Sequence, residues 1–215
     1  AYPAYPEGSL ARVHFIIGRF EGNTPDPPQQ ELEAAIAEIA RTWADKLSRC
    51  LAAAFDARTA ARLFELYGEA FPPGYRDGFT PEAAVEDIRR IERLSEERPL
   101  EVEFYRAAPT DTQAEVNLKL IHLGEAIELS RRVPLLEHMG FRVIEEDSYE
   151  VTPAGRTDSI FVHDMTLETQ SGQAVDLENR GGLLASCFVA VWFGDAENDG
   201  YNALVVNAGL DWRAV

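Results

Sequence analysis

The chain has 215 residues, and its hydrophobic share of 46% is ordinary for a globular protein, which excludes a wholly disordered chain. Its formal net charge of −17 argues against binding to nucleic acid or to anionic membranes, because both need concentrated lysine and arginine. Only Lys46 and Lys119 are lysines, and the arginines are scattered. A chain of this length can bury one substantial core or two small ones.

The two cysteines, Cys50 and Cys187, lie far apart and form no metal-ligand spacing, so we interpret both as reduced, packed thiols. No charged and then apolar leader opens the sequence, and no apolar run approaches the roughly 18 residues that a membrane span needs. These features predict a cytoplasmic protein. The start within AYPAYPEG fits a piece of a longer protein, or removal of an initiator methionine before alanine.

The first half of the sequence begins with a predicted strand. Residues 1–10 carry two prolines and a glycine and are interpreted as a linker. Residues 11–18, ARVHFIIG, then alternate apolar positions as a strand does. This strand has no neighbour in sequence, so we expect it to pair with the main sheet or with a sheet of a partner, because an unpaired apolar edge promotes aggregation.

Helices are expected to follow. Apolar residues recur every three or four positions over residues 29–51, which predicts one long amphipathic helix. A second helix is expected near residues 57–67, followed by a loop over residues 72–78. Thr80 then precedes proline and glutamate, an order typical of a helix N-terminus, and apolar spacing continues this helix towards Pro99.

The second half of the sequence alternates strands with helices. Residues 100–105 and 117–123 show two-residue alternation and predict an antiparallel hairpin. Ser130 is expected to cap a short helix that Gly140 ends. Further elements are predicted as strands from residue 141 and over 160–167, and as helices over 175–193 and 201–208. Gly181-Gly182 weakens the first of these helices, because each glycine costs about 1 kcal/mol relative to alanine.

Hairpin, helix, strand, strand and helix lie close to the βαββαβ ferredoxin-like plan, with one additional strand in front. The predicted fold class is therefore α+β: a ferredoxin-like antiparallel sheet with helices on one face, plus a helical N-terminal part led by one strand. We expect two domains, a strand-led helical segment over residues 1–98 and a ferredoxin-like domain over residues 99–215.

Candidate catalytic groups show no constellation. The histidines have no HxH or HxxxH spacing, and no GxSxG, GxGxxG or GxxxxGK motif occurs. His163-Asp164 could join a base to its orienting carboxylate, but adjacent strand residues point to opposite faces. We interpret Glu145-Glu146-Asp147 as a solvated hairpin tip, because the spacing of a calcium loop is absent. The four histidines are His14, His122, His138 and His163.

One ligand-binding hypothesis follows from the residues alone. Arg131 and Arg132 follow Ser130 at a predicted helix N-terminus, where free backbone N–H groups and positive side chains could hold an anion. The alternative is that the two arginines form a surface pair. We expect no catalytic, cofactor-binding or metal-binding residue in the chain.

Four stretches carry a family resemblance. They are SLARVHFIIGR (9–19), FPPGYRDGFTPEAAVEDI (71–88), PLLEHMGFRVIEEDSYEV (134–151) and GDAENDGYNALVVNAGLDWR (194–213). Together, and in this order, they resemble the large bacterial NAD-dependent glutamate dehydrogenases, in blocks that lie just before the catalytic domain. The resemblance covers nearly the whole chain.

The resemblance implies an enzyme that oxidises L-glutamate to 2-oxoglutarate and ammonium with NAD, as a cytoplasmic homo-oligomer. It also implies that this portion contains ACT-like domains, ferredoxin-like modules that often sense amino acids. The expected ferredoxin-like domain over residues 99–215 would then be ACT-like, and residues 1–98 could complete a neighbouring ACT-like domain. The catalytic motifs are absent from these residues, so the expected role is a non-catalytic regulatory and assembly segment that contacts the catalytic domain. It could bind an amino-acid effector near residues 124–132 or act through packing alone. A free-standing enzyme is the remaining alternative, and it would need His163, Asp164 and residues 145–147 to converge.

Overall fold

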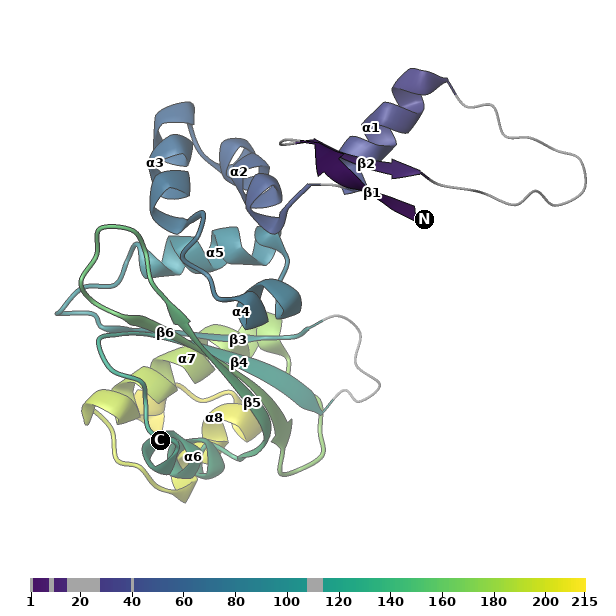
Figure 1. The fold of residues 1–215 in the computed structure, drawn as a ribbon. Helices are drawn as coiled ribbons and strands as arrows, with labels where there is room; N and C mark the ends of the chain where they lie inside the picture. The colour runs from purple at the N-terminus through teal and green to yellow at the C-terminus, as the bar shows by residue number, and fades with distance from the viewer. Residues whose placement is uncertain (1, 8–9, 15–27, 40, 108–113) are drawn as a thin grey trace, which may run out of the picture. The chain divides into compact units, whose positions relative to one another are not determined.

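The computed structural model describes residues 2–7, 10–14, 28–39, 41–107 and 114–215 (Figure 1). The chain divides into two compact units, residues 1–41 and 42–215. Among the described residues, no helix has both the length and the apolar character needed to cross a membrane.

The first unit contains a hairpin and a helix. Strand β1 (Tyr2–Glu7) pairs antiparallel with β2 (Leu10–His14), and α1 (Gln29–Ile39) follows. The interpretation of residues 1–10 as a linker was therefore wrong, because residues 2–7 form β1, the neighbour with which β2 pairs. The part of the expected 11–18 strand beyond residue 14 lies outside the described residues.

The second unit begins with four helices, where the sequence predicted fewer. They are α2 (Trp43–Ala54), α3 (Ala57–Tyr67), α4 (Pro73–Gly78) and α5 (Pro81–Ile91). The prediction of one long helix over 29–51 was wrong, because Thr42 starts a new helix. Its hydroxyl accepts from the Asp45 N–H, and the Asp45 carboxylate accepts from the Thr42 N–H, which satisfies two free donors of the helix start.

The Pro-Pro-Gly stretch also differs from its prediction. Residues 73–78 form α4 rather than a loop, with Pro73 at the first helical position, where its missing N–H has no helical partner to lose. Thr80 caps α5 as expected, its hydroxyl accepting from the Ala83 N–H.

The remainder of the second unit is a four-stranded antiparallel sheet with three further helices. The strands are β3 (Leu100–Tyr105), β4 (Glu115–Leu123), β5 (Phe141–Val151) and β6 (Ile160–Thr169), in the order β3-β4-β6-β5. The helices are α6 (Leu129–His138), α7 (Leu177–Phe193) and α8 (Ala203–Ala208), with short 3₁₀ turns η1 (Gly200–Asn202) and η2 (Trp212–Ala214).

The predicted hairpin of β3 and β4 is confirmed, with Leu100 facing His122 and Tyr105 facing Asn117. The order from β4 to α7 is strand, helix, strand, strand, helix, which is the ferredoxin-like plan up to its last strand. The strand beside β4 at the sheet edge is β3, which precedes β4 in sequence. Helix α7 is followed by α8 and not by a strand. The additional leading strand thus fills the place of the final strand.

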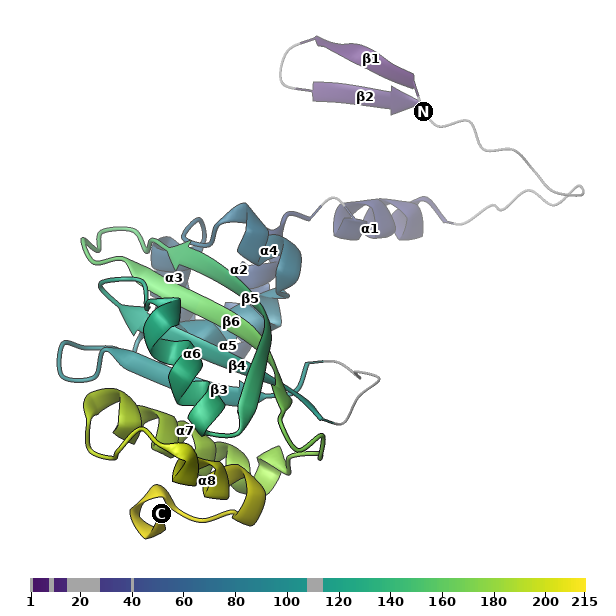
Figure 2. The ribbon, with the colours of Figure 1, turned by 90° about the horizontal axis from the view of Figure 1, so that it is seen from below.

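Helices cover both faces of the sheet (Figures 1 and 2). The helices within residues 99–215 lie on one face, as predicted, and bury Leu118, Met165 and Phe188 in one core. The other face packs against α2–α5, and its Ile121 and Val162 join a second core. The expectation of helices on one face was therefore incomplete, because the helical segment covers the second face.

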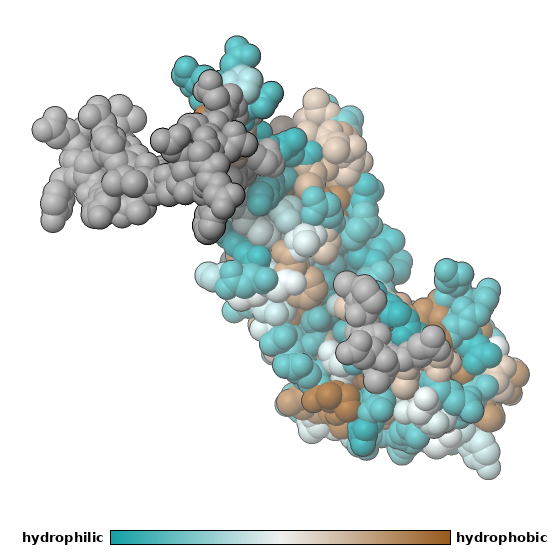
Figure 3. All heavy atoms as spheres, turned by 90° about the vertical axis from the view of Figure 1, so that its right-hand side faces the viewer, coloured by the Kyte–Doolittle hydropathy of each residue, from teal (hydrophilic) through white to brown (hydrophobic). Residues whose placement is uncertain are grey.

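Two local predictions were also tested. Residues 145–147 lie inside β5, next to a β-bulge, and not at a hairpin tip. Helix α7 is continuous across Gly181-Gly182, and it ends at Gly194, whose φ of 83° suits a residue without a side chain. On the face shown in Figure 3, hydrophilic residues surround separate hydrophobic patches.

Candidate functional site

A cavity of about 510 Å³ opens beside the start of α6, at the loop that the sequence singled out. Acidic and aromatic side chains dominate its lining. They include His122 from β4, Glu125 and Glu128 from the loop, Arg131 from α6, and Trp192 and Phe193 from α7. The cavity therefore joins the β4–α6 loop to the C-terminal end of α7.

Arg131 lines this cavity but is engaged by α7. Its guanidinium carbon lies 3.6 Å from the ring centroid of Trp192, a cation–π distance. The same side chain donates to the Trp192 carbonyl oxygen at 2.7 Å. Arg131 thus ties the start of α6 to the end of α7.

Arg132 points elsewhere, although it is the next residue. It is 3% exposed and forms an ion pair with Glu146 of β5. Consecutive helical residues differ in direction by about 100°, so the two side chains leave α6 towards different partners. Arg132 therefore belongs to the packing between α6 and the sheet.

His163 extends this buried polar group. Its Nε2 accepts the Ile127 N–H at 3.3 Å, and its Nδ1 lies 2.7 Å from the Ser148 hydroxyl and 3.2 Å from Glu146. Because Nε2 accepts, the proton of the neutral ring lies on Nδ1. Burial, aided by the Arg132 charge and opposed by Glu146, lowers the pKa of His163 to about 4. A neutral His163 thus holds the loop that lines the cavity.

Ser130 is not the N-cap that the sequence predicted. Helix α6 starts at Leu129, with Glu128 in the cap position and no side-chain cap hydrogen bond. The Ser130 hydroxyl donates to the Glu128 carboxylate at 3.1 Å. Of Ser130, Arg131 and Arg132, the structure places only Arg131 at the cavity, and binding of an anion by the three stays a prediction.

A second polar cluster lies on the opposite face of the sheet, where the sequence suggested only scaffold. The Lys119 ammonium lies 2.9 Å from the Asp87 carboxylate of α5, and both side chains are at most 5% exposed. The Tyr75 hydroxyl of α4 donates to the same carboxylate at 2.5 Å. Lys119 also lies 4.0 Å from the ring centroid of Phe79. Burial of such a charge is tolerable only when it is paired in this way.

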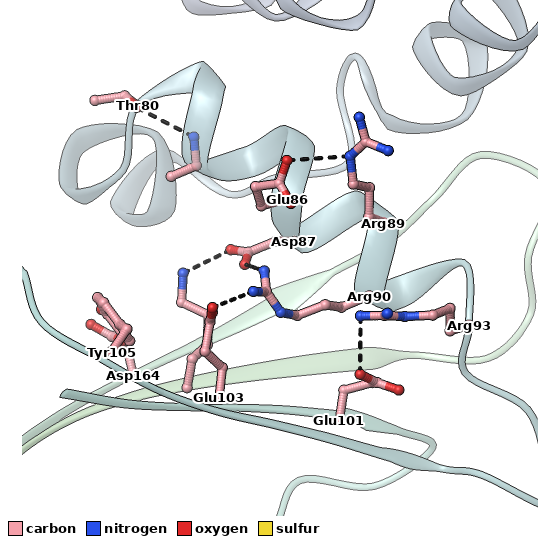
Figure 4. Close-up of polar contacts among 12 residues, drawn as sticks. Thr80, Glu86, Asp87, Arg89, Arg90, Arg93, Glu101, Glu103, Tyr105 and Asp164 are labelled. Atoms are coloured by element: carbon pink, nitrogen blue, oxygen red, sulfur yellow. Dashed lines mark hydrogen bonds and ion pairs between the residues drawn. The ribbon is translucent and has the colours of Figure 1, made fainter. Parts of the chain in front are cut away.

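Arg90 and Tyr105 extend the cluster sideways (Figure 4). Arg90 of α5 pairs with Glu103 of β3 and lies 3.6 Å from Asp87. The Tyr105 hydroxyl donates to Asp164 of β6 at 2.7 Å. Figure 4 shows Asp87 and Arg90 pointing from the helix towards the strands that carry these groups.

The strand residues of this cluster form one row across the sheet. Glu103 is the cross-strand partner of Lys119, Lys119 of Asp164, and Asp164 of Asp147. Burial raises the pKa of Asp164, although the Tyr105 hydrogen bond and Lys119 oppose it. Burial likewise raises the pKa of Glu103 against the opposing effect of Arg90. The only sign of this row in the sequence was the polar positions of the alternating strands. Such positions suggest a solvent-facing side of a sheet, because a strand pattern does not reveal that a helix such as α5 covers them.

The groups that a free-standing enzyme would need do not converge. His163 faces the core with α6 and α7, whereas Asp164 joins the row under α5, as their adjacency predicted. Glu146 meets His163, and Asp147 belongs to the row. Within the part of the chain that the structure describes, no group of three or more histidine, cysteine or acidic residues could hold a metal ion.

Family models match three consecutive parts of the chain. Residues 1–44 match the glutamate dehydrogenase ACT2 domain, residues 50–94 match helical motif 2, and residues 99–180 match the ACT3 domain. The helical motif corresponds to the layer of α2–α5, and the ACT3 match begins at the sheet.

Curated relatives agree along nearly the whole chain. All are named NAD-specific glutamate dehydrogenase: the Halomonas elongata protein is 37% identical over 97% of this chain, the Pseudomonas aeruginosa protein 32% over 98%, and the Mycobacterium tuberculosis protein 31% over 97%. The chain spans about 13% of the length of the first two and 14% of the third. It belongs to the family of large NAD-specific glutamate dehydrogenases, as the segment that carries ACT2, helical motif 2 and ACT3 sequences.

Proposed function

We propose that the chain is a non-catalytic regulatory and assembly segment of an NAD-dependent glutamate dehydrogenase. The parent enzyme would convert L-glutamate, NAD and water to 2-oxoglutarate, ammonium and NADH, as a cytoplasmic homo-oligomer. The sequence holds no glycine-rich dinucleotide turn and no glycine-flanked lysine, so its residues do not fit NAD. The proposal therefore places NAD and the reaction in the remainder of the polypeptide.

The contact between the helical motif and the ACT sheet carries this proposal. Helices α2–α5 share one apolar core with the sheet, and Asp87 pairs with Lys119 at its centre. The same sheet forms the wall of the second core, with α6–α8. These packed side chains and this buried ion pair support a coupling role, because networks of this kind can carry coupling between distant sites.

The domain division remains part of the proposal. We place an ACT-like domain in residues 99–215 and a strand-led helical segment in residues 1–98. The order of β1, β2 and α1 is strand, strand, helix, the same as that of β5, β6 and α7. This likeness and the ACT2 match support the idea that the first residues complete a neighbouring ACT-like domain.

The test uses the full-length enzyme with Lys119→Met, which breaks the central ion pair, and the exposed Lys46→Met as the matched control. We expect Lys119→Met alone to change kcat or KM for glutamate, or the solution mass. Faster amide hydrogen exchange in the helical motif of Lys119→Met would show that the contact is weakened. If exchange is faster while the kinetics and the solution mass are unchanged, the coupling role is contradicted. Reduction of NAD with glutamate by the 215-residue chain alone would overturn the whole proposal.

The cavity near the 124–132 loop favours a second function, the binding of an amino-acid effector. Its volume of about 510 Å³ is sufficient for a small molecule. Calorimetric titration of the chain with a panel of amino acids tests this, with Trp192→Leu as the variant that removes a cavity wall. Saturable heat that this variant abolishes would support binding, and flat titrations across the panel would leave packing as the only role.

A further inference from the structure

The charged row under α5 holds more acids than bases. Four carboxyl groups, those of Asp87, Glu103, Asp147 and Asp164, face the two cations Lys119 and Arg90. Asp147 is exposed, but Asp87 is 1% and Lys119 4% exposed. Excess negative charge under a helical layer is costly, because the low dielectric strengthens repulsion and removes solvation.

Of the three carboxyl groups in the row that are not solvent-exposed, Asp164 has the weakest compensation. Asp87 has Lys119 at 2.9 Å, and Glu103 has a direct ion pair with Arg90. The hydrogen bond to Asp164 comes from the neutral Tyr105 hydroxyl. No direct ion pair of Asp164 occurs among the described residues.

The surroundings of Asp164 come from five elements. Tyr105 of β3 donates to it, and Lys119 of β4 attracts it from the neighbouring row position. Asp147 lies directly opposite on β5, where like charges destabilise a pair, and Asp87 of α5 and Tyr75 of α4 lie over the row. Two carboxylates thus repel this group and one ammonium attracts it.

We propose that Asp164 makes the contact between the helical motif and the ACT sheet proton-dependent, and we call this contact the latch. The latch is more stable when the Asp164 carboxyl group is neutral than when it is a carboxylate. Uptake of one proton relieves the repulsion from Asp147 and Asp87 and leaves Lys119 and Arg90 for the remaining acids. The raised pKa of Asp164 agrees with this direction, because burial favours the neutral acid.

The sign of the pH effect follows by linkage. A carboxyl group whose pKa is higher in the folded than in the unfolded state contributes stability below its unfolded pKa, and this contribution is lost as the pH rises through the folded pKa. The latch therefore weakens from acidic towards neutral and alkaline pH. The proton-dependent contact rests on the proposed coupling function and adds two states to it. Its test does not measure glutamate oxidation.

The test measures hydrogen–deuterium protection factors of the α5 amides in the chain, corrected for intrinsic exchange, from about pH 4, near the ordinary aspartate pKa, to pH 8. Because His163 makes the second unit more stable as the pH rises, the effect of Asp164 is measured as the ratio of protection in the unmodified chain to that in Asp164→Asn, which mimics the neutral acid. We expect this ratio to fall as the pH rises, to about one third at pH 8, within the range of one buried polar interaction. Asp158→Asn, at an exposed position outside the row, is the matched control and should show the same protection as the unmodified chain at every pH. A ratio that does not change with pH would overturn the proposal.

A second measurement needs no variant. The ¹³C chemical shift of the Asp164 carboxyl group reports its protonation in the unmodified chain. We expect a titration midpoint above that of an ordinary aspartate, while an ordinary or lower midpoint contradicts the latch. Failure here would leave the coupling role through Lys119 intact, whereas an inert Lys119→Met in the full-length enzyme would remove that role and leave the latch.

Discussion

At the scale of single residues, His163 shows how burial fixes a protonation state. Its Nε2 can accept the Ile127 N–H only while it carries no proton. The pKa of about 4 lies below the ordinary value for histidine, so the neutral ring contributes stability above the unfolded pKa. That contribution is lost as the pH falls through the folded pKa.

We expect the free energy of unfolding to fall between about pH 6.5 and pH 4, with His163 contributing to the slope. His163→Asn should reduce this slope and cost about 1–3 kcal/mol at pH 7, because Ile127 loses its acceptor. Urea unfolding at several pH values measures both effects. His138→Asn, at an exposed position, should keep the slope; an unchanged slope in His163→Asn would contradict the assignment.

Lys119 forms the buried ion pair on the face of the sheet that α2–α5 cover. Lys119→Met should cost about 3–5 kcal/mol, because the buried Asp87 loses its nearer cation and keeps only Arg90, at 3.6 Å. Lys46→Met should stay within about 0.5 kcal/mol. The double variant Lys119→Met/Asp87→Leu should recover part of the loss. Chemical unfolding tests this series, and equal effects of the two lysine changes would show that the ion pair is unimportant.

At the scale of elements, α7 contains two glycines that its continuity does not require. Gly182 has helical backbone, and a Cβ at this position would meet nothing within 4 Å. Gly182→Ala should therefore raise the free energy of unfolding by about 0.5–1 kcal/mol. Gly194→Ala should lower it, because φ is 83° there. Thermal unfolding distinguishes the two, and a destabilising Gly182→Ala would mean that this surface of α7 is occupied in solution.

Alternation and cap signals predicted the elements well where local chemistry decides them. The β3–β4 hairpin and the Thr80 cap follow from residues within a few positions of each other. Helix α4 was missed because a Pro-Pro-Gly sequence suits both a turn and a helix start. The candidate site was predicted only in part, since which way Arg131 and Arg132 point depends on the partners Trp192 and Glu146 from distant elements.

The charged row was missed for a related reason. Its members occupy the polar positions of alternating strands, and such a pattern normally indicates a solvent-facing side. Only tertiary packing of α5 buries them, with Asp87 about 30 positions from its partner Lys119. A strand pattern carries no information about a second helical layer, so sequence reasoning placed helices on one face only.

At the scale of the whole molecule, the assembly role has a direct test. The solution mass of the 215-residue chain, by light scattering at several concentrations, shows whether subunit contacts lie in this segment. If the segment assembles the enzyme, we expect a concentration-independent dimer or larger species. A strict monomer would instead mean that its exposed surfaces contact the remainder of the polypeptide, and would leave an intramolecular coupling role.

The two cores of residues 42–215 share the sheet as a common wall, so they should fold and unfold together. Trp43 packs against the core on the helical-motif side, and Trp192 lies in the core on the other side. Single-tryptophan chains that keep one or the other should therefore report the same urea midpoint, as two-state unfolding requires. Lys119→Met removes a contact on the Trp43 side, and under two-state unfolding it should lower both midpoints by the same amount. Separate midpoints in the unmodified chain would show that the sheet does not join the two cores, and coupling through it would then have no physical basis.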